Sequence, residues 1–120
     1  MAPILDSAEE VFMLHPKIRW AAKTSERGEV KFCKMRPGVN SLTPIEKDVF
    51  FMETGVLVLL GVCEQMVSWH GSVNSLVISY DRVAMYVRRL GSDVLALTLD
   101  QHDSLGTTMH ELGTRINQLL

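Results

Sequence analysis

The chain has 120 residues, 47% of them hydrophobic and 22% charged, with a formal net charge of −2. This composition excludes a disordered or low-complexity chain and predicts a packed globular protein with one domain over residues 1–120. The N-terminus lacks the basic and apolar regions of a secretory signal, and the apolar stretch at 49–67 includes Glu53 and Glu64. Because a membrane span needs ~18 or more apolar residues, we expect a cytoplasmic protein with no membrane span.

The first 35 residues predict a helix followed by a hairpin. Apolar residues at helical spacing cover 6–14, and His15-Pro16 ends that helix. Residues 17–24 and 29–35 then alternate apolar and polar side chains on either side of a turn at Arg27-Gly28. This is the pattern of two antiparallel strands.

After a loop at 36–41, a long helix is predicted over residues 43–70. Thr43 and Glu46 have the spacing of a capping box, Pro44 suits the first helical turn, and Gly71 suits the left-handed conformation that ends a helix. On a helical wheel the apolar residues form two stripes, where a simple surface helix has one. The first stripe is predicted to face the core and contains Ile45, Val49, Met52, Val56, Leu59, Leu60, Cys63 and Val67.

The second stripe points more than a quarter turn away from the first. It contains Phe51, Val58, Val62 and Trp69, at spacings of seven, four and seven residues. A second apolar face needs a second cover. In a chain this short, that cover is another copy of the same helix or a partner protein.

The remaining residues predict three strands and a final helix. Apolar segments at 73–80, 83–89 and 93–99 are separated by breaks too short for a parallel crossover, so they form an antiparallel meander. Leu76, Ile78 and Tyr80 should share one face of it. The last helix begins at about Ser104, and we interpret Gly106 and Gly113 as positions where it approaches the sheet closely.

The order of these elements resembles the roadblock/dynein light chain family over nearly the whole chain. The resemblance rests on that order, on the Arg27-Gly28 turn, and on the segments YDRVAMYV at 80–87 and VLALTL at 94–99. The segment PKIR at 16–19, with the long helix and the strands at 80–99, is also similar to an uncharacterised archaeal family of similar length.

The roadblock resemblance implies an α/β (α+β) fold with the element order α-ββ-α-βββ-α. A five-stranded antiparallel sheet would have the long helix on one face and the terminal helices on the other. The resemblance also implies a homodimer with paired long helices and joined edge strands, acting as a non-enzymatic platform for a small GTPase or another signalling complex. We therefore predict a dimer interface made by Phe51, Val58, Val62, Trp69, Leu76 and Ile78.

Two alternatives to this function stay open. A small-molecule sensor would use an apolar pocket lined by methionines, here Met13, Met35, Met52, Met66, Met85 and Met109. A binder of anionic partners would use the basic first hairpin, with Lys17, Arg19, Lys23, Arg27, Lys31 and Lys34. Nucleic acid is not expected as that partner, because the aromatic residues of the hairpin alternate away from its charges.

Residues with catalytic or metal-binding chemistry are few. His102 and His110 lack the spacing of known metal motifs, and no nucleophile signature surrounds Cys33 or Cys63. We expect no catalytic residue, no metal and no cofactor, and we interpret both cysteines as buried structural thiols without a disulfide.

Overall fold

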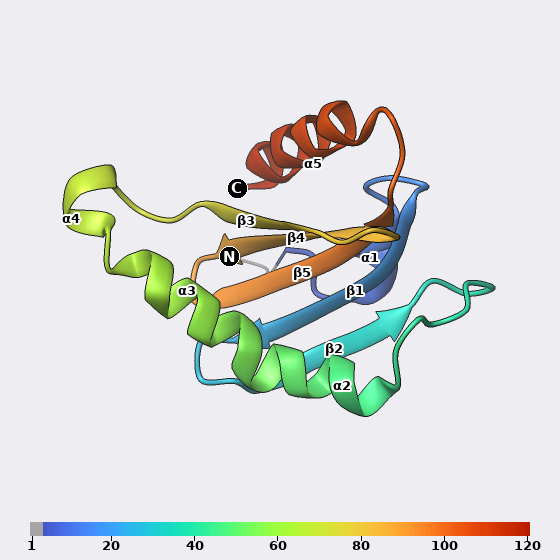
Figure 1. Cartoon of the computed structure of the whole chain (residues 1–120), viewed down its shortest axis with the longest axis horizontal. Helices are drawn as coiled ribbons and strands as arrows, with labels where there is room; N and C mark the ends of the chain where they lie inside the picture. Colours follow the sequence, from blue (N-terminus) through green and yellow to red (C-terminus); the bar gives the residue numbers. More distant parts are fainter. Residues whose placement is uncertain (1–3) are drawn as a thin grey trace.

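The structure, a computed structural model, describes residues 4–120 and has an antiparallel five-stranded sheet with helices on both faces (Figure 1). In spatial order the strands are β2 Val30–Met35, β1 Ile18–Ser25, β5 Asp93–Asp100, β4 Val83–Leu90 and β3 Ser75–Ser79. The α+β class and the predicted order of elements are confirmed.

The predicted hairpin is present as β1 and β2, which pair with Ala22 opposite Cys33. Gly28 turns the chain with φ of 85°, a conformation that side chains with a Cβ rarely adopt. The register shifts between Lys23 and Thr24, and this bulge twists the end of the hairpin. The predicted meander is also present, with Val77 of β3 opposite Tyr86 of β4, and Tyr86 opposite Leu97 of β5.

Helices α1, Ala8–Phe12, and α5, Leu105–Leu119, cover one face of the sheet, and together they bury an apolar core. Leu112 and Ile116 of α5 are fully buried there. A Cβ on Gly113 would lie 3.6 Å from the Tyr86 hydroxyl, which is ordinary contact. The predicted close approach is wrong for Gly106, because a Cβ there would meet only open space.

The long helical segment crosses the other face, where Met52, Val56 and Leu60 are buried against strand residues such as Trp20 and Val87. The prediction of one continuous helix is wrong. It consists of α2 Ile45–Phe50, a π-helical turn η1 Phe51–Gly55, α3 Val56–Glu64 and, after a break at residues 65–66, α4 Val67–His70. Consequently Ile45, Leu59 and Val67 of the predicted core stripe are exposed.

The predicted capping box at the start of this segment is also wrong. Pro44 is the N-cap, with an extended backbone and no side-chain cap, and its carbonyl accepts from the amide of Lys47 at 3.0 Å. The Thr43 hydroxyl instead donates to Asp48 Oδ1 at 2.6 Å. The helix therefore starts one residue later, and Thr43 ties the preceding loop to its first turn.

Candidate interaction surface

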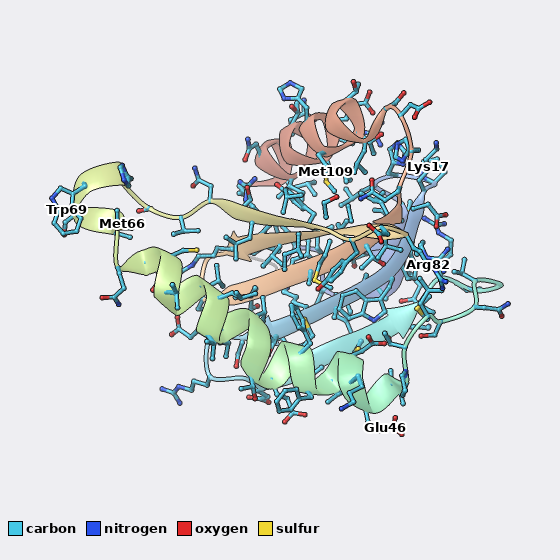
Figure 2. All side chains as sticks on the ribbon, in the orientation of Figure 1. Lys17, Glu46, Met66, Trp69, Arg82 and Met109 are labelled. Atoms are coloured by element: carbon cyan, nitrogen blue, oxygen red, sulfur yellow. The ribbon has the colours of Figure 1, made fainter. Side chains whose placement is uncertain are left out.

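An uncovered apolar surface runs along α3 and α4. Val58, Val62 and Trp69 are 58%, 65% and 76% exposed. Figure 2 shows Trp69 and Met66 at the far end of this segment, on a turn that extends beyond the sheet. These three residues of the second stripe point away from the core, as predicted. Their contact with another molecule stays a prediction.

The fourth member of that stripe, Phe51, is placed differently because of the π turn. A π turn contains one residue more than an α turn, so it rotates the preceding residues by about 100° relative to α3. Phe50 thus takes the outward position and is 63% exposed. Phe51 turns inward and packs against the apolar cluster on the sheet.

Strand β3 forms an edge of the sheet beside this surface. Leu76 and Ile78 are half-buried and face the side of α3, since they pair with Val87 and Met85, whereas Val77 is exposed on the opposite face. The strand carries no charge, proline or bulge, the features that usually prevent a further strand from pairing with an edge. Its outer backbone groups can therefore pair with a second chain.

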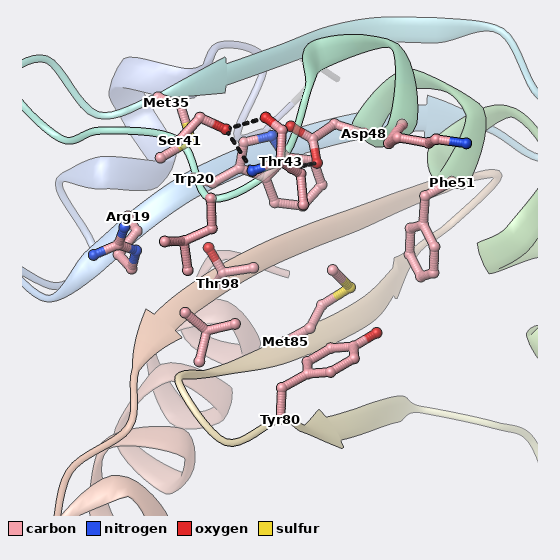
Figure 3. A pocket seen from close by; sticks show the side chains of 13 residues that line it. Arg19, Trp20, Met35, Ser41, Thr43, Asp48, Phe51, Tyr80, Met85 and Thr98 are labelled. Atoms are coloured by element: carbon pink, nitrogen blue, oxygen red, sulfur yellow. Dashed lines mark hydrogen bonds between the residues drawn. The ribbon is translucent and has the colours of Figure 1, made fainter.

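A pocket of about 340 Å³ lies between α2, the loop at residues 36–44 and the sheet. Figure 3 shows Phe51, Met85 and Tyr80 gathered along one wall, with Ser41, Thr43 and Asp48 at another end. The Ser41 hydroxyl donates to the Thr43 carbonyl at 2.6 Å and accepts from the Thr43 amide at 3.2 Å. The polar end of the pocket is thus held by hydrogen bonds between its own residues.

Two of the six methionines considered for a pocket, Met35 and Met85, line this one. Met52 is fully buried in the core, and Met109 packs against the cluster on the other face of the sheet. Met13 and Met66 are exposed. The methionines therefore do not gather around one cavity.

Cys33 and Cys63 are both free and half-buried. Burial raises the pKa of the Cys33 thiol, the neighbouring Trp20 indole opposes this rise, and the Asp48 carboxylate adds to it. A raised pKa keeps the thiol protonated and disfavours attack on a substrate. This environment supports the structural interpretation of Cys33.

The basic residues of the first hairpin do not form one exposed cluster. Lys23 is buried, and its ammonium donates to the Ile4 carbonyl at 3.0 Å and lies 3.5 Å from Asp93 Oδ2. Lys31 also pairs with Asp93, at 2.9 Å. Lys23 therefore does not belong to a surface, contrary to the sequence-based hypothesis.

The other hairpin cations differ in their pairing. Arg19 pairs with Asp100 at 2.8 Å, and Lys34 pairs with Glu9 of α1. Lys17 and Arg27 are exposed and make no salt bridge with any residue in 4–120. Four of the six cations thus pair with three carboxylates, Asp93, Asp100 and Glu9, so the hairpin does not present all six charges to an external anion.

The two candidate metal ligands on the last segment have separate surroundings. His102 has Nδ1 2.8 Å from the Asp100 carbonyl oxygen and Nε2 3.1 Å from the Thr108 hydroxyl. Among residues 4–120, no group of three or more His, Cys, Asp or Glu side chains could hold a metal ion.

The part of the chain that the structure describes also has no helix long and apolar enough to cross a membrane.

The sheet order, the helical segment over one face and the two terminal helices over the other define a roadblock-like fold. No protein-family model matches the sequence, and no curated protein matches it significantly. Solved structures do match. The gliding protein MglB of Thermus thermophilus superposes with a TM-score of 0.68 at 20% identity, over 89% of this chain and 77% of that one.

Two further matches agree with this assignment of the fold. A Roadblock/LC7 domain from Streptomyces avermitilis superposes with a TM-score of 0.55 at 21% identity, over 87% of this chain and 86% of that one. MglB of Myxococcus xanthus does so with a TM-score of 0.60 at 12% identity, over 89% and 88% of the two chains. The roadblock resemblance seen in the sequence is therefore confirmed at the level of the fold.

Proposed function

We propose that residues 1–120 form one roadblock-like domain that acts as a non-enzymatic, homodimeric interaction platform. One observation carries this proposal: the exposed apolar surface of α3 and α4 lies beside an uncharged, unpaired sheet edge. Two copies related by a two-fold axis would cover both features at once, because the same patch serves both partners.

Burial of aromatic and branched side chains would drive this association. The proposed interface contains Val58, Val62 and Trp69 from the helical surface, Phe51 beside the pocket, and Leu76 and Ile78 from β3. Apolar burial contributes ~25 cal/mol per Å², from which the cost of ordering two molecules is subtracted. Pairing of the β3 edges would add backbone hydrogen bonds and give the interface a defined register.

The proposed partner of the dimer is a small GTPase or another signalling protein. Two considerations support this choice. The roadblock resemblance implies platforms of that kind, and two of the matched structures are of MglB, one of them named as a gliding protein. Affinity capture followed by mass spectrometry tests it, and the proposal requires that a GTPase or signalling protein bind the wild type and bind the monomeric variant below far more weakly.

The dimer is tested by light scattering coupled to size exclusion. We expect the wild type to have twice the mass of the 13.5 kDa chain, and the double variant Val58→Glu, Val62→Glu to be a folded monomer. The matched control is Met13→Glu, Leu119→Glu, which places the same two charges at exposed apolar positions outside the proposed interface. It should stay dimeric.

A monomeric wild type at micromolar concentration would contradict the homodimer. A double variant that remained a dimer would contradict the assigned surface. Circular dichroism on each variant verifies that the helices are retained, so that loss of mass is not confused with unfolding.

A further inference from the structure

We propose that the pocket beside α2 is filled by Trp69 of the partner subunit in the dimer. This inference rests on the proposed homodimer and adds a specific contact to it. Within its own chain Trp69 cannot fill the pocket, because α4 and α2 lie at opposite ends of the long helical segment (Figure 1). An antiparallel, two-fold arrangement brings these two ends together.

The spacing of the apolar residues sets the register of that arrangement. In a two-fold pair, residue i contacts residue j while j contacts i. Val58 and Val62 are both largely exposed and lie two residues on either side of Leu60, so pairing them places the two-fold axis level with Leu60, which itself faces the core. Phe51 and Trp69 lie nine residues on either side of Leu60, in opposite arms of the segment, so antiparallel pairing brings the Trp69 end of one copy to the Phe51 end of the other.

Gly61 supports a close approach at this centre. A glycine within a helix costs ~1 kcal/mol relative to alanine, and no contact within residues 4–120 explains Gly61, since a Cβ there would meet nothing within 4 Å. Opposite another helix, the missing side chain allows the two backbones to approach closely. Its place next to Leu60 agrees with the register set by the two valines.

The pocket has the size and walls that an indole side chain needs. Its volume of about 340 Å³ is near the lower end of the ~300–1,000 Å³ typical of small-ligand sites. Phe51, Tyr80 and Met85 provide aromatic and thioether surfaces for stacking (Figure 3). In the single chain the Trp69 side chain is 76% exposed, so docking would remove a large apolar area from water.

The polar end of the pocket supplies an acceptor for the indole N–H. Buried tryptophan usually donates this hydrogen bond. The Asp48 carboxylate lines the pocket, accepts one hydrogen bond from Thr43, and makes no salt bridge within residues 4–120. It therefore retains acceptor capacity. Lys47, also at the pocket, can place its ammonium against the ring face.

The break before α4 allows Trp69 to leave the line of α3. Met66 has φ of −98° and ψ of 2°, outside the helical range, and α4 is offset from the axis of α3 in Figure 1. If α3 and α4 were one continuous helix, Trp69 would lie between the two paired helices. The offset lets it point from the end of one copy toward the sheet of the other.

The experiment uses the two tryptophans of the chain, Trp20 and Trp69, of which Trp20 is buried. Because Trp20 also lines the pocket, it is kept, and the difference in fluorescence between the wild type and Trp69→Phe reports on Trp69. We expect blue-shifted emission and slow quenching by acrylamide in the dimer, with red-shifted emission and fast quenching once Val58→Glu, Val62→Glu is added.

Affinity provides the second measurement. Trp69→Ala should weaken dimerisation by roughly 30-fold, as expected for a buried aromatic anchor. Asp48→Asn, which keeps an acceptor, should weaken it less than Asp48→Ala. The control is Met66→Ala, because Met66 is exposed just before α4 but is not assigned to the pocket. Its dimer dissociation constant, measured by sedimentation, should change little.

The outcomes separate this inference from the proposed function. A dimer whose Trp69 is quenched as fast as in the monomeric variant would overturn the docking of Trp69 and leave the dimer standing. A monomeric wild type would overturn both. A small molecule found bound in the pocket by native mass spectrometry, at one per chain of the dimer, would also overturn it, because the pocket would then be a ligand site.

Discussion

The two faces of the sheet differ in how far the chain itself covers them. On one face α1 and α5 close the core, and residues such as Val11, Leu97 and Leu112 are fully buried. On the other face the helical segment buries Met52, Val56 and Leu60 but leaves Val62 and Trp69 exposed. The first face is therefore closed by the chain itself, whereas the second, open face has a buried core of its own and also has the character of half an interface.

The largest expected effect comes from breaking the closed face. Leu112→Ala removes a fully buried side chain from α5 and should lower the free energy of unfolding by ~2–5 kcal/mol, from lost apolar burial and the cavity left behind. Urea denaturation measures this loss. The open-face counterpart Val62→Ala should cost less than ~1 kcal/mol when measured on the monomer, because that side chain is largely in water. Equal costs for both variants would contradict the distinction between the faces.

A smaller effect is expected where the open face contacts the first hairpin. Gly28 has positive φ, and a Cβ there would lie 2.7 Å from the Glu53 carbonyl oxygen in the π turn. Gly28→Ala should destabilise the fold by ~2–4 kcal/mol, combining the left-handed penalty with displacement of that turn. Gly38→Ala is the matched control: its φ is 84°, but a Cβ would meet nothing within 4 Å.

Thermal denaturation compares the two glycine variants. The control should lose only the ~1–2 kcal/mol of the left-handed conformation. If both lose the same amount, the hairpin and the π turn do not contact each other as closely as the structure shows.

Gly61→Ala sharpens the comparison, since its effects on the single chain and on the dimer have opposite signs. Alanine should stabilise the helix by up to ~1 kcal/mol and weaken association by roughly tenfold or more, from the ~1–3 kcal/mol cost of overpacking. Gly106→Ala on α5 is the control, because a Cβ there also meets open space. It should stabilise without changing the dimer dissociation constant, which analytical ultracentrifugation measures.

The smallest expected effect depends on pH and belongs to the closed face. Burial lowers the pKa of His15, and the Glu111 carboxylate opposes this. The unfolded chain, with a histidine pKa near ~6.5, then binds a proton more readily than the folded chain. Stability should therefore fall as the pH drops through that range and level off below the folded-state pKa of His15. Denaturation midpoints between pH 7 and pH 5 should show this slope, and His15→Asn should reduce it.

The elements with strong local signals were predictable. Glycine readily adopts the positive φ that the tight turn at Gly28 requires, so the hairpin turn could be located from the sequence. The breaks between the last three strands admit only antiparallel neighbours. Apolar residues at helical spacing predict the last helix, and two of them, Leu112 and Ile116, are fully buried in α5.

Features that depend on contacts distant in sequence were not predictable. In the sequence Lys23 has the position of a surface cation in an alternating strand. In the structure it is buried, and its ammonium donates to the Ile4 carbonyl and pairs with Asp93. The π turn depends on the fit of Phe51 and Met52 to the sheet, and periodicity cannot locate it. For the same reason the pocket beside α2 could not be located, since its walls come from segments that are far apart in the sequence, between Arg19 and Thr98.

The sequence by itself determined the order of elements and the existence of a second apolar stripe, because these follow from local periodicity and turn residues. The resemblance to the roadblock family rests on that order. Only the tertiary structure decided which residues occupy that stripe. One extra residue in the π turn exchanges Phe50 for Phe51, and the break before α4 moves Trp69 off the helix axis. Helical phase is cumulative along the chain, so a single irregular turn, stabilised by packing, changes which side chains face a partner.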